Sequence, residues 1–312
     1  MTSPAPRPAP AHLSEQAQAF LANPRPDSAV PAPEDLEAWA AQAAGIEAYF
    51  VSMFAGMPLP VTETETQIGS AHVYVLQPDG LPEGDTGPLM LNVHGGGLVY
   101  GGGRACALTG AVQALSLGMT TWSLDYRMAP QHPYPAGLDD AMAAYRAMLE
   151  VRDPADLFIS GGSAGANIAA ALLVRAKDEG LPMPAAAVLT TPEVDLTESG
   201  DTFTVLDGVD NMLGSLMPVN LMYADGNDLA HPYLSPLFAD LTGFPPTFLQ
   251  SGTRDLFLSN TVRFHRALLA AGVPTELHVF EAMPHGGFGG SSPEDADLSA
   301  TVRTFVDAHR RG

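Results

Sequence analysis

The chain alternates strand-like and helix-like stretches along most of its length. Short apolar runs recur between residues 71 and 280, and helical stretches of ordinary length separate most of them. Strands that alternate with such helices build βαβ units, in which neighbouring strands are parallel. The pattern therefore predicts an α/β fold with a mainly parallel central sheet flanked by helices.

The positions of these stretches give an element order. We expect strands at 71–76, 88–93, 120–124, 157–160, 185–190, 246–250 and 275–280. We expect helices at 12–21, 33–54, 105–115, 137–151, 164–178, 259–271 and 293–310. The alternation fails between Glu193 and Leu237, where glycines and prolines recur without a clear strand. A long insertion of this kind usually forms a lid or a binding loop.

The charge of the chain excludes several classes of partner. Its 312 residues include 35 acidic and 14 basic ones, which gives a net charge of −21. Such a chain has no basic surface for nucleic acid or for an anionic membrane. No run approaches the roughly 18 apolar residues that span a bilayer, so we expect no stable membrane insertion. The first residues carry no apolar signal segment, and we expect a cytoplasmic protein.

The single cysteine narrows the chemistry further. Cys106 has no second cysteine with which to form an intramolecular disulfide or a multi-cysteine zinc site. It falls in a predicted helix, so we expect it to take no part in catalysis.

The segment Gly161-Gly162-Ser163-Ala164-Gly165 matches the pattern G-x-S-x-G between a predicted strand and a predicted helix. Small flanking residues let the chain turn sharply there and present the serine hydroxyl as a nucleophile. The N–H of Ala164 would lie at a helix N-terminus, where a developing oxyanion is stabilised. The alternative is a small-residue turn without chemistry, because the five-residue pattern alone is common by chance.

A glycine run follows the strand expected at 88–93. In His94-Gly95-Gly96-Gly97, backbone N–H groups can point inward without obstruction by a Cβ atom. We expect Gly95 and Gly96 to be oxyanion donors together with Ala164, and His94 to orient the loop. The alternative is a flexible turn or a phosphate loop, but no Lys-Ser/Thr pair follows, which excludes a P-loop.

The candidate base is a histidine that follows the serine in the chain. Where a nucleophilic serine sits on a strand-to-helix turn, the acid and then the histidine follow it. The histidines after Ser163 are His231, His265, His278, His285 and His309. Only His285 directly follows a predicted strand, in a loop at its carboxyl end, where catalytic groups gather in open α/β sheets. We therefore expect His285 to be the base.

The candidate acid lies between Ser163 and His285. Asp255 follows the strand expected at 246–250 and a turn at Gly252, which favours it. Asp195, which follows an earlier strand, and Asp240, which precedes this one, are rivals.

These motifs together resemble the hormone-sensitive-lipase-like esterases, the bacterial family IV carboxylesterases of the α/β-hydrolase fold. Residues 126–140 read YRMAPQHPYPAGLDD, similar to YRLAPEHPFPAAxDD in that family, and the resemblance covers about residues 60–312. Two positions depart from the family pattern. Gly162 replaces the aspartate of G-D-S-A-G, and Gln131 replaces a glutamate.

The resemblance implies both a function and a domain plan. Ser163, Asp255 and His285 would hydrolyse short- to medium-chain carboxylic esters through an acyl-enzyme, without cofactor or metal. The family also has a helical cap, which residues 1–60 and an insertion at about 196–230 would form over a catalytic domain of residues 61–312. The expected partner is a small ester substrate, and a homodimer is an open possibility. A lactone hydrolase, an amidase and a non-catalytic ligand-binding module remain alternatives.

Overall fold

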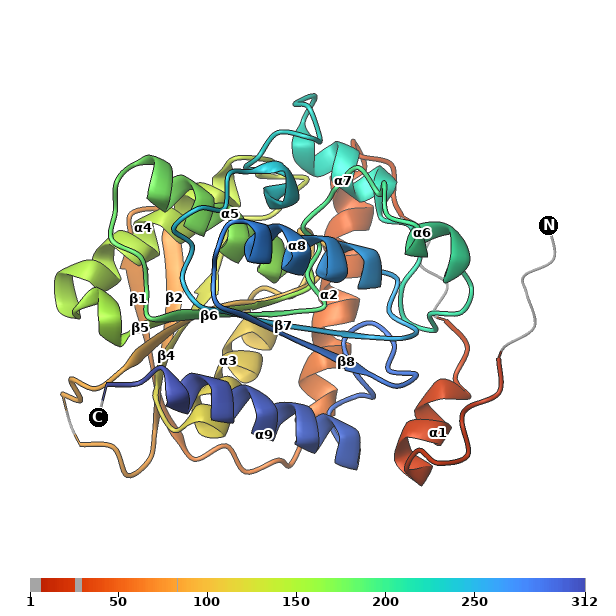
Figure 1. Cartoon of the computed structure of the whole chain (residues 1–312), viewed down its shortest axis with the longest axis horizontal. Coiled ribbons are helices and arrows are strands. Elements are labelled where there is room, and N and C mark those ends of the chain that lie inside the picture. The colour runs from red at the N-terminus through yellow and green to blue at the C-terminus, as the bar shows by residue number, and fades with distance from the viewer. Residues whose placement is uncertain (1–6, 26–29, 83, 312) are drawn as a thin grey trace.

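The computed structural model describes residues 7–25, 30–82 and 84–311. One eight-stranded sheet runs through the molecule in the order β1-β2-β4-β3-β5-β6-β7-β8 (Figure 1). The strands are β1 (Val61–Ile68), β2 (Ala71–Pro78), β3 (Leu89–Val93), β4 (Thr120–Asp125), β5 (Leu157–Gly162), β6 (Ala186–Thr190), β7 (Thr247–Gly252) and β8 (Thr275–Phe280). From β4 to β8 every neighbouring pair is parallel, so the predicted mainly parallel sheet is confirmed.

The sheet begins with an antiparallel strand that our sequence analysis did not predict. β1 pairs antiparallel with β2, and β2 pairs antiparallel with β4. The β1 sequence VTETETQI lacks the apolar run by which we recognised the other strands, because β1 is an edge strand exposed over much of its surface. The recurring β-branched threonines between Val61 and Ile68 are the signal that could have revealed it.

Helices cover both faces of the sheet. The helices of the sheet layers are α3 (Arg104–Leu117), α4 (Ala136–Val151), α5 (Ala164–Asp178), α8 (Leu258–Ala270) and α9 (Pro293–Ala308). In Figure 1, α3 and α9 lie below the sheet, and α4, α5 and α8 lie above it. Each falls within a few residues of its predicted range.

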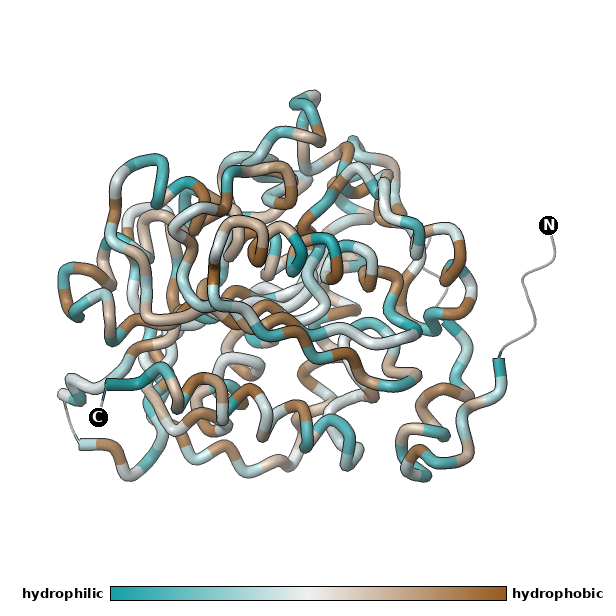
Figure 2. Tube along the Cα trace, in the orientation of Figure 1, coloured by the Kyte–Doolittle hydropathy of each residue, from teal (hydrophilic) through white to brown (hydrophobic). Residues whose placement is uncertain are grey.

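The core follows from this layering. One buried cluster joins α4, α5 and α8 to the upper face of the sheet, and a second joins α9 to the other face through Met90, Phe158 and Phe248. Figure 2 shows hydrophobic residues concentrated in the central strands. Because the inner strands are buried on both faces, they read as continuous apolar runs rather than as alternating ones.

The remaining helices belong to the two segments that we expected to form a cap. The N-terminal segment contains α1 (Glu15–Leu21) and α2 (Leu36–Met53), and the insertion contains α6 (Thr202–Val205) and α7 (Met217–Ala224). Residues 30–33 and Trp39 line a pocket of about 520 Å³ together with Ser215, Pro218 and Met222 of the insertion. The two segments therefore meet. The apolar side chains of α1 pack against the loop that follows β8, and the Phe20 carbonyl oxygen of α1 accepts a hydrogen bond from Asn211 of the insertion.

None of the helices in the described ranges is both long and apolar enough to span a bilayer.

Candidate active site

Ser163 sits on a strained turn between β5 and α5. Its backbone has φ 55° and ψ −124°, a conformation that non-glycine residues rarely adopt. The flanking glycines make this turn possible. A Cβ atom on Gly161 would lie 2.4 Å from the Gly165 carbonyl oxygen, and one on Gly165 would lie 2.1 Å from the Val93 carbonyl oxygen. Position 162 is less crowded, since the nearest atom to an added Cβ there would be Thr190 Oγ1, at 3.1 Å.

The three residues expected to act together do lie in a hydrogen-bonded row. Ser163 Oγ is 2.8 Å from His285 Nε2, and His285 Nδ1 is 3.0 Å from Asp255 Oδ1. Because a carboxylate oxygen only accepts, Nδ1 carries the proton and Nε2 is left to accept the proton of the serine hydroxyl. The donors and acceptors of these three residues are therefore arranged so that His285 can remove the proton of the Ser163 hydroxyl.

Asp255 is held firmly in this row. It is fully buried in the turn that follows β7. Its Oδ2 accepts a 2.5 Å hydrogen bond from Ser251 Oγ, and its Oδ1 also accepts one from the Phe257 N–H. These donors satisfy the carboxylate and fix the direction in which it faces His285.

The rival carboxylates have other partners. Asp195 is buried but binds Arg263 at 2.7 Å and accepts hydrogen bonds from Thr197 and Ser199. Asp240 is largely exposed beside Lys177. Neither has a hydrogen bond to His285 within the described residues.

The glycine run lies against the serine turn. A Cβ atom on Gly95 would be 2.9 Å from the Gly162 carbonyl oxygen and 3.4 Å from Ser163 Cβ. Gly96 has φ 121°, which an L side chain would strain to adopt. Among the residues that the structure describes, no acceptor is bonded to the N–H groups of Gly95, Gly96 and Ala164. These donors are available to an anion near Ser163.

His94 lies beneath the glycine run rather than in the row of Ser163, Asp255 and His285. Its Nδ1 is 2.8 Å from the Gly95 carbonyl oxygen, and its ring stacks on Tyr126 with centroids 4.3 Å apart. The Tyr126 hydroxyl in turn donates to the His94 carbonyl oxygen. These contacts hold the start of the loop in place.

Charges around His285 set its protonation. Burial by itself lowers the pKa of His285, but the hydrogen bond and charge of Asp255, with the charge of Asp210, outweigh burial and raise that pKa. Asp210 lies close by, and its Oδ2 accepts hydrogen bonds from the backbone N–H groups of Leu256 and His285. Burial raises the pKa of Asp210.

Glu193 is the second buried carboxyl near His285 that our sequence analysis missed. It is 1% exposed and lies after β6, where its N–H donates to the Ser163 carbonyl oxygen at 3.3 Å. Burial raises the pKa of Glu193 to about 8, against smaller opposing effects of Asn220 and His285. The sequence signal was a carboxyl directly after a strand of the parallel sheet, the same criterion that singled out Asp255.

A family model described as alpha/beta hydrolase fold matches residues 90–288. Two curated relatives are an acetyl-hydrolase of Streptomyces hygroscopicus and the carboxylesterase NlhH of Mycobacterium tuberculosis. The first is 33% identical over 65% of this chain and 69% of its own length. The second is 34% identical over 65% of this chain and 67% of its own length.

Solved structures agree over a longer span. The crystal structure of esterase E25 is 33% identical, with a TM-score of 0.90 over 100% of this chain and 99% of its own. A hormone-sensitive lipase from a metagenome library is 31% identical, with a TM-score of 0.81 over 91% of this chain and 93% of its own.

Proposed function

Since the chain belongs to the α/β-hydrolase family, among its hormone-sensitive-lipase-like esterases, we propose that it hydrolyses carboxylic esters with Ser163 as the nucleophile. The observation that carries the proposal is the hydrogen-bonded row Ser163–His285–Asp255, with spacings of 2.8 and 3.0 Å. Such a row is the arrangement by which a hydroxyl is activated for attack.

In the first half of the reaction, Ser163 Oγ attacks the ester carbonyl carbon as its proton passes to His285 Nε2. Asp255 holds the imidazole in the Nδ1–H tautomer and stabilises the imidazolium that forms. His285 then gives the proton to the departing alcohol oxygen, and the acyl group stays on Ser163.

The tetrahedral intermediate places a negative charge on the former carbonyl oxygen. We assign its stabilisation to the N–H groups of Gly95, Gly96 and Ala164, whose positions beside Ser163 and lack of another acceptor among the described residues support this role. The Ala164 N–H also belongs to the first turn of α5, where the helix dipole favours negative charge. We assign His94 the role of orienting the loop.

In the second half, a water molecule replaces the alcohol. His285 removes its proton, the hydroxide attacks the acyl carbon, and the carboxylic acid leaves as Ser163 regains its proton. The chain's own side chains and N–H groups suffice for every step.

The direct test is hydrolysis of p-nitrophenyl butyrate by the wild type and by Ser163→Ala. Removing the hydroxyl should lower kcat by at least ~10³-fold while the circular dichroism spectrum stays unchanged. Near-wild-type turnover by the folded variant would disprove the assignment. A parallel series of an ester, a lactone and an anilide of the same acyl group separates esterase, lactonase and amidase activity.

We propose further that residues 1–60 and 196–230 form a cap on the catalytic domain of residues 61–312. Two contacts support this. The pocket of about 520 Å³ is shared by both segments, and Leu216 Cδ1 would be 3.9 Å from a Cβ atom on Gly97, next to the glycine donors. Met222→Trp should reduce the pocket and raise KM for longer acyl chains more than for acetate, whereas equal changes for all chain lengths would argue against a cap that selects substrates.

We also propose that the protein is cytoplasmic and that it forms a homodimer. Cell fractionation tests the first, and light scattering on the purified full chain tests the second.

A further inference from the structure

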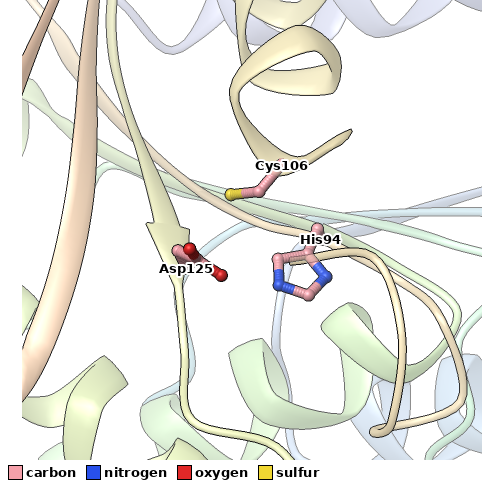
Figure 3. Close-up of side chains that lie close together, drawn as sticks. All are labelled: His94, Cys106 and Asp125. Atoms are coloured by element: carbon pink, nitrogen blue, oxygen red, sulfur yellow. The ribbon is translucent and has the colours of Figure 1, made fainter. Parts of the chain in front are cut away.

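Three side chains of different chemistry lie together behind the glycine run. They are His94, Cys106 and Asp125, and Figure 3 shows them facing a common space. One ligand atom from each lies within 4.8 Å of the other two. His94 and Cys106 are buried, whereas the Asp125 side chain is 20% exposed. The mechanism proposed above uses neither Cys106 nor Asp125.

The topology explains why these residues meet. The parallel strands β3 and β4 pair Val93 with Leu124, so the next residues, His94 and Asp125, reach the same edge of the sheet. Helix α3 begins at Arg104 beside this edge and places Cys106 in its first turn. Three separate segments are thereby fixed around one point.

The hydrogen bonding of His94 leaves one ring nitrogen, Nε2, without a proton. The Gly95 carbonyl oxygen only accepts, so the hydrogen bond at 2.8 Å puts the proton on Nδ1. Burial lowers the pKa of His94, against smaller opposing effects of the Gly95 hydrogen bond and the Asp125 charge, which favours the neutral ring. Nε2 therefore carries a lone pair, and this buried atom has no hydrogen-bond partner among the described residues.

The surroundings of this lone pair are electron-rich. Figure 3 shows a ring nitrogen of His94 turned toward the Asp125 carboxylate. Asp125 accepts a hydrogen bond from the Gly103 N–H at 3.1 Å and lies 3.4 Å from His72 Nδ1. The Cys106 sulfur lies 3.3 Å from Ser123 Oγ. A lone pair, a sulfur and a carboxylate that face one another are a set of atoms that can bind a cation.

We propose that His94 Nε2, Cys106 Sγ and an Asp125 carboxylate oxygen form a binding site for a borderline divalent cation such as Zn²⁺. Imidazole nitrogen, thiolate and carboxylate are the ligands that zinc takes in proteins, and three protein ligands leave a position for water. The hydrogen bond from His94 Nδ1 to a backbone carbonyl is the support that zinc-bound histidines usually have.

Binding requires a small contraction and the loss of one proton. Zinc bonds of about 2.0–2.3 Å set tetrahedral ligand atoms roughly 3.3–3.6 Å apart, so the atoms within 4.8 Å must close by about 1 Å. The Cys106 thiol, whose pKa burial raises, must release its proton to solvent. Affinity should therefore increase with pH.

The cation should also slow ester hydrolysis. His94 directly precedes Gly95 and Gly96, so drawing its ring toward Cys106 moves the N–H groups assigned to the oxyanion. This effect rests on the proposed function, whereas the binding site itself does not.

Cobalt provides a specific test because Cys106 is the only thiol in the chain. Adding Co²⁺ to the full-length protein should produce a cobalt–thiolate charge-transfer band that saturates at one ion per chain and disappears when Zn²⁺ is added. Cys106→Ser and Cys106→Ala should abolish the band, and Asp125→Asn should weaken binding at least ~10-fold. The exposed His132→Gln is the matched control and should leave the band unchanged.

The wild-type titration decides the proposal even if a variant fails to fold. Absence of the band with Co²⁺ in large excess would overturn it. So would a band that a folded Asp125→Asn variant retains at full affinity. The metal site and the proposed function can fail separately. If the metal site exists but Ser163 is not the nucleophile, the cobalt band appears and Ser163→Ala keeps its turnover.

Discussion

At the scale of the residue, the identity of the acid decides whether His285 can act as a base. Asp255→Asn should lower kcat by up to ~10⁴-fold, because an amide facing Nδ1 favours the wrong tautomer of the imidazole. Asp240→Asn, at an exposed site, serves as the control and should stay close to wild type. Steady-state kinetics of the variants measures both, together with Asp195→Asn. Greater damage from Asp195→Asn in a folded chain would mean that the acid is misassigned.

The pH profile reports on the charges around His285. Its pKa is raised, so kcat/KM should fall in acid with a midpoint above the ordinary value of about 6.5. Asp210→Asn removes one of the charges that raise this pKa, and the acid limb should move to lower pH by on the order of 0.5–1 pH unit. Asp207→Asn, on an exposed neighbour, should leave the limb in place. A limb that both variants share with the wild type would show that Asp210 does not act on His285.

Glu193 should make the stability of the protein depend on pH. Its folded-state pKa of about 8 lies above that of an unfolded glutamate, so the folded chain binds an extra proton between these values. That contribution is fully present below pH ~4.5 and is lost as the pH rises through about 8. Glu193→Gln should therefore narrow the difference in unfolding free energy between pH 5 and pH 9 by on the order of a few kcal/mol, because a tenfold difference in proton affinity corresponds to about 1.4 kcal/mol.

Urea unfolding at the two pH values measures this difference. The exposed Glu150→Gln provides the control and should leave the difference as it is in the wild type. If Glu193→Gln behaves like the control, Glu193 is ionised throughout the range.

The row of Ser163, Asp255 and His285 could be predicted from the sequence because each residue follows a strand of the parallel sheet in a recognisable order. The proximity of Asp210 to His285 and the raised pKa of Glu193 could not be predicted from the sequence. Both depend on burial and on contacts with residues far away in the chain, such as the hydrogen bond from the Leu256 N–H to Asp210, which no local pattern encodes.

At the scale of the element, most strands and helices were predictable because they are buried and therefore apolar. β1 was missed because an edge strand needs only alternation, and here the alternating residues are Thr and Glu. The short helices α6 and α7 lie in the insertion, where glycine and proline obscure any period. The sequence predicted the ends of α1 to within three residues, but it did not predict which part of the chain α1 packs against.

The packing of α1 against the loop that follows β8 leads to a testable prediction. Leu13, Ala17 and Leu21 pack against Ala282, Met283 and Phe288, in the loop that carries His285. Removing residues 1–23 should expose this loop, lower the melting temperature and reduce kcat. As a control, Arg25→Ala removes exposed polar contacts with Asp207 and the Leu213 carbonyl oxygen, and it should change stability by no more than about 0.5 kcal/mol.

Thermal unfolding and p-nitrophenyl butyrate kinetics measure both variants. A truncated chain with wild-type stability and kcat would show that the contact does not support His285.

At the scale of the whole molecule, a net charge of −21 makes the folded chain repel itself. Raising the ionic strength from about 0.01 M to about 0.15 M shortens the screening length from ~30 Å to ~8 Å. The melting temperature at pH 7 should rise by roughly 2–4 °C for each kcal/mol of repulsion removed. Scanning calorimetry in a sodium chloride series measures this rise.

The control is the same series near pH 4, where many carboxyl groups are neutral. The rise should be much smaller there. A melting temperature that falls with salt at pH 7 would mean that attractive ion pairs outweigh the repulsion.

The contact between α1 and the end of the chain also bears on how the protein is made. Ser14 donates through both its N–H and its hydroxyl to Glu294, 280 positions later. During synthesis, α1 is made well before the surface on which it packs. Contacts of such long sequence separation form late in folding. The loop that carries His285 therefore acquires its packing against α1 only late in folding, after all the residues from Ser14 to Glu294 have been made.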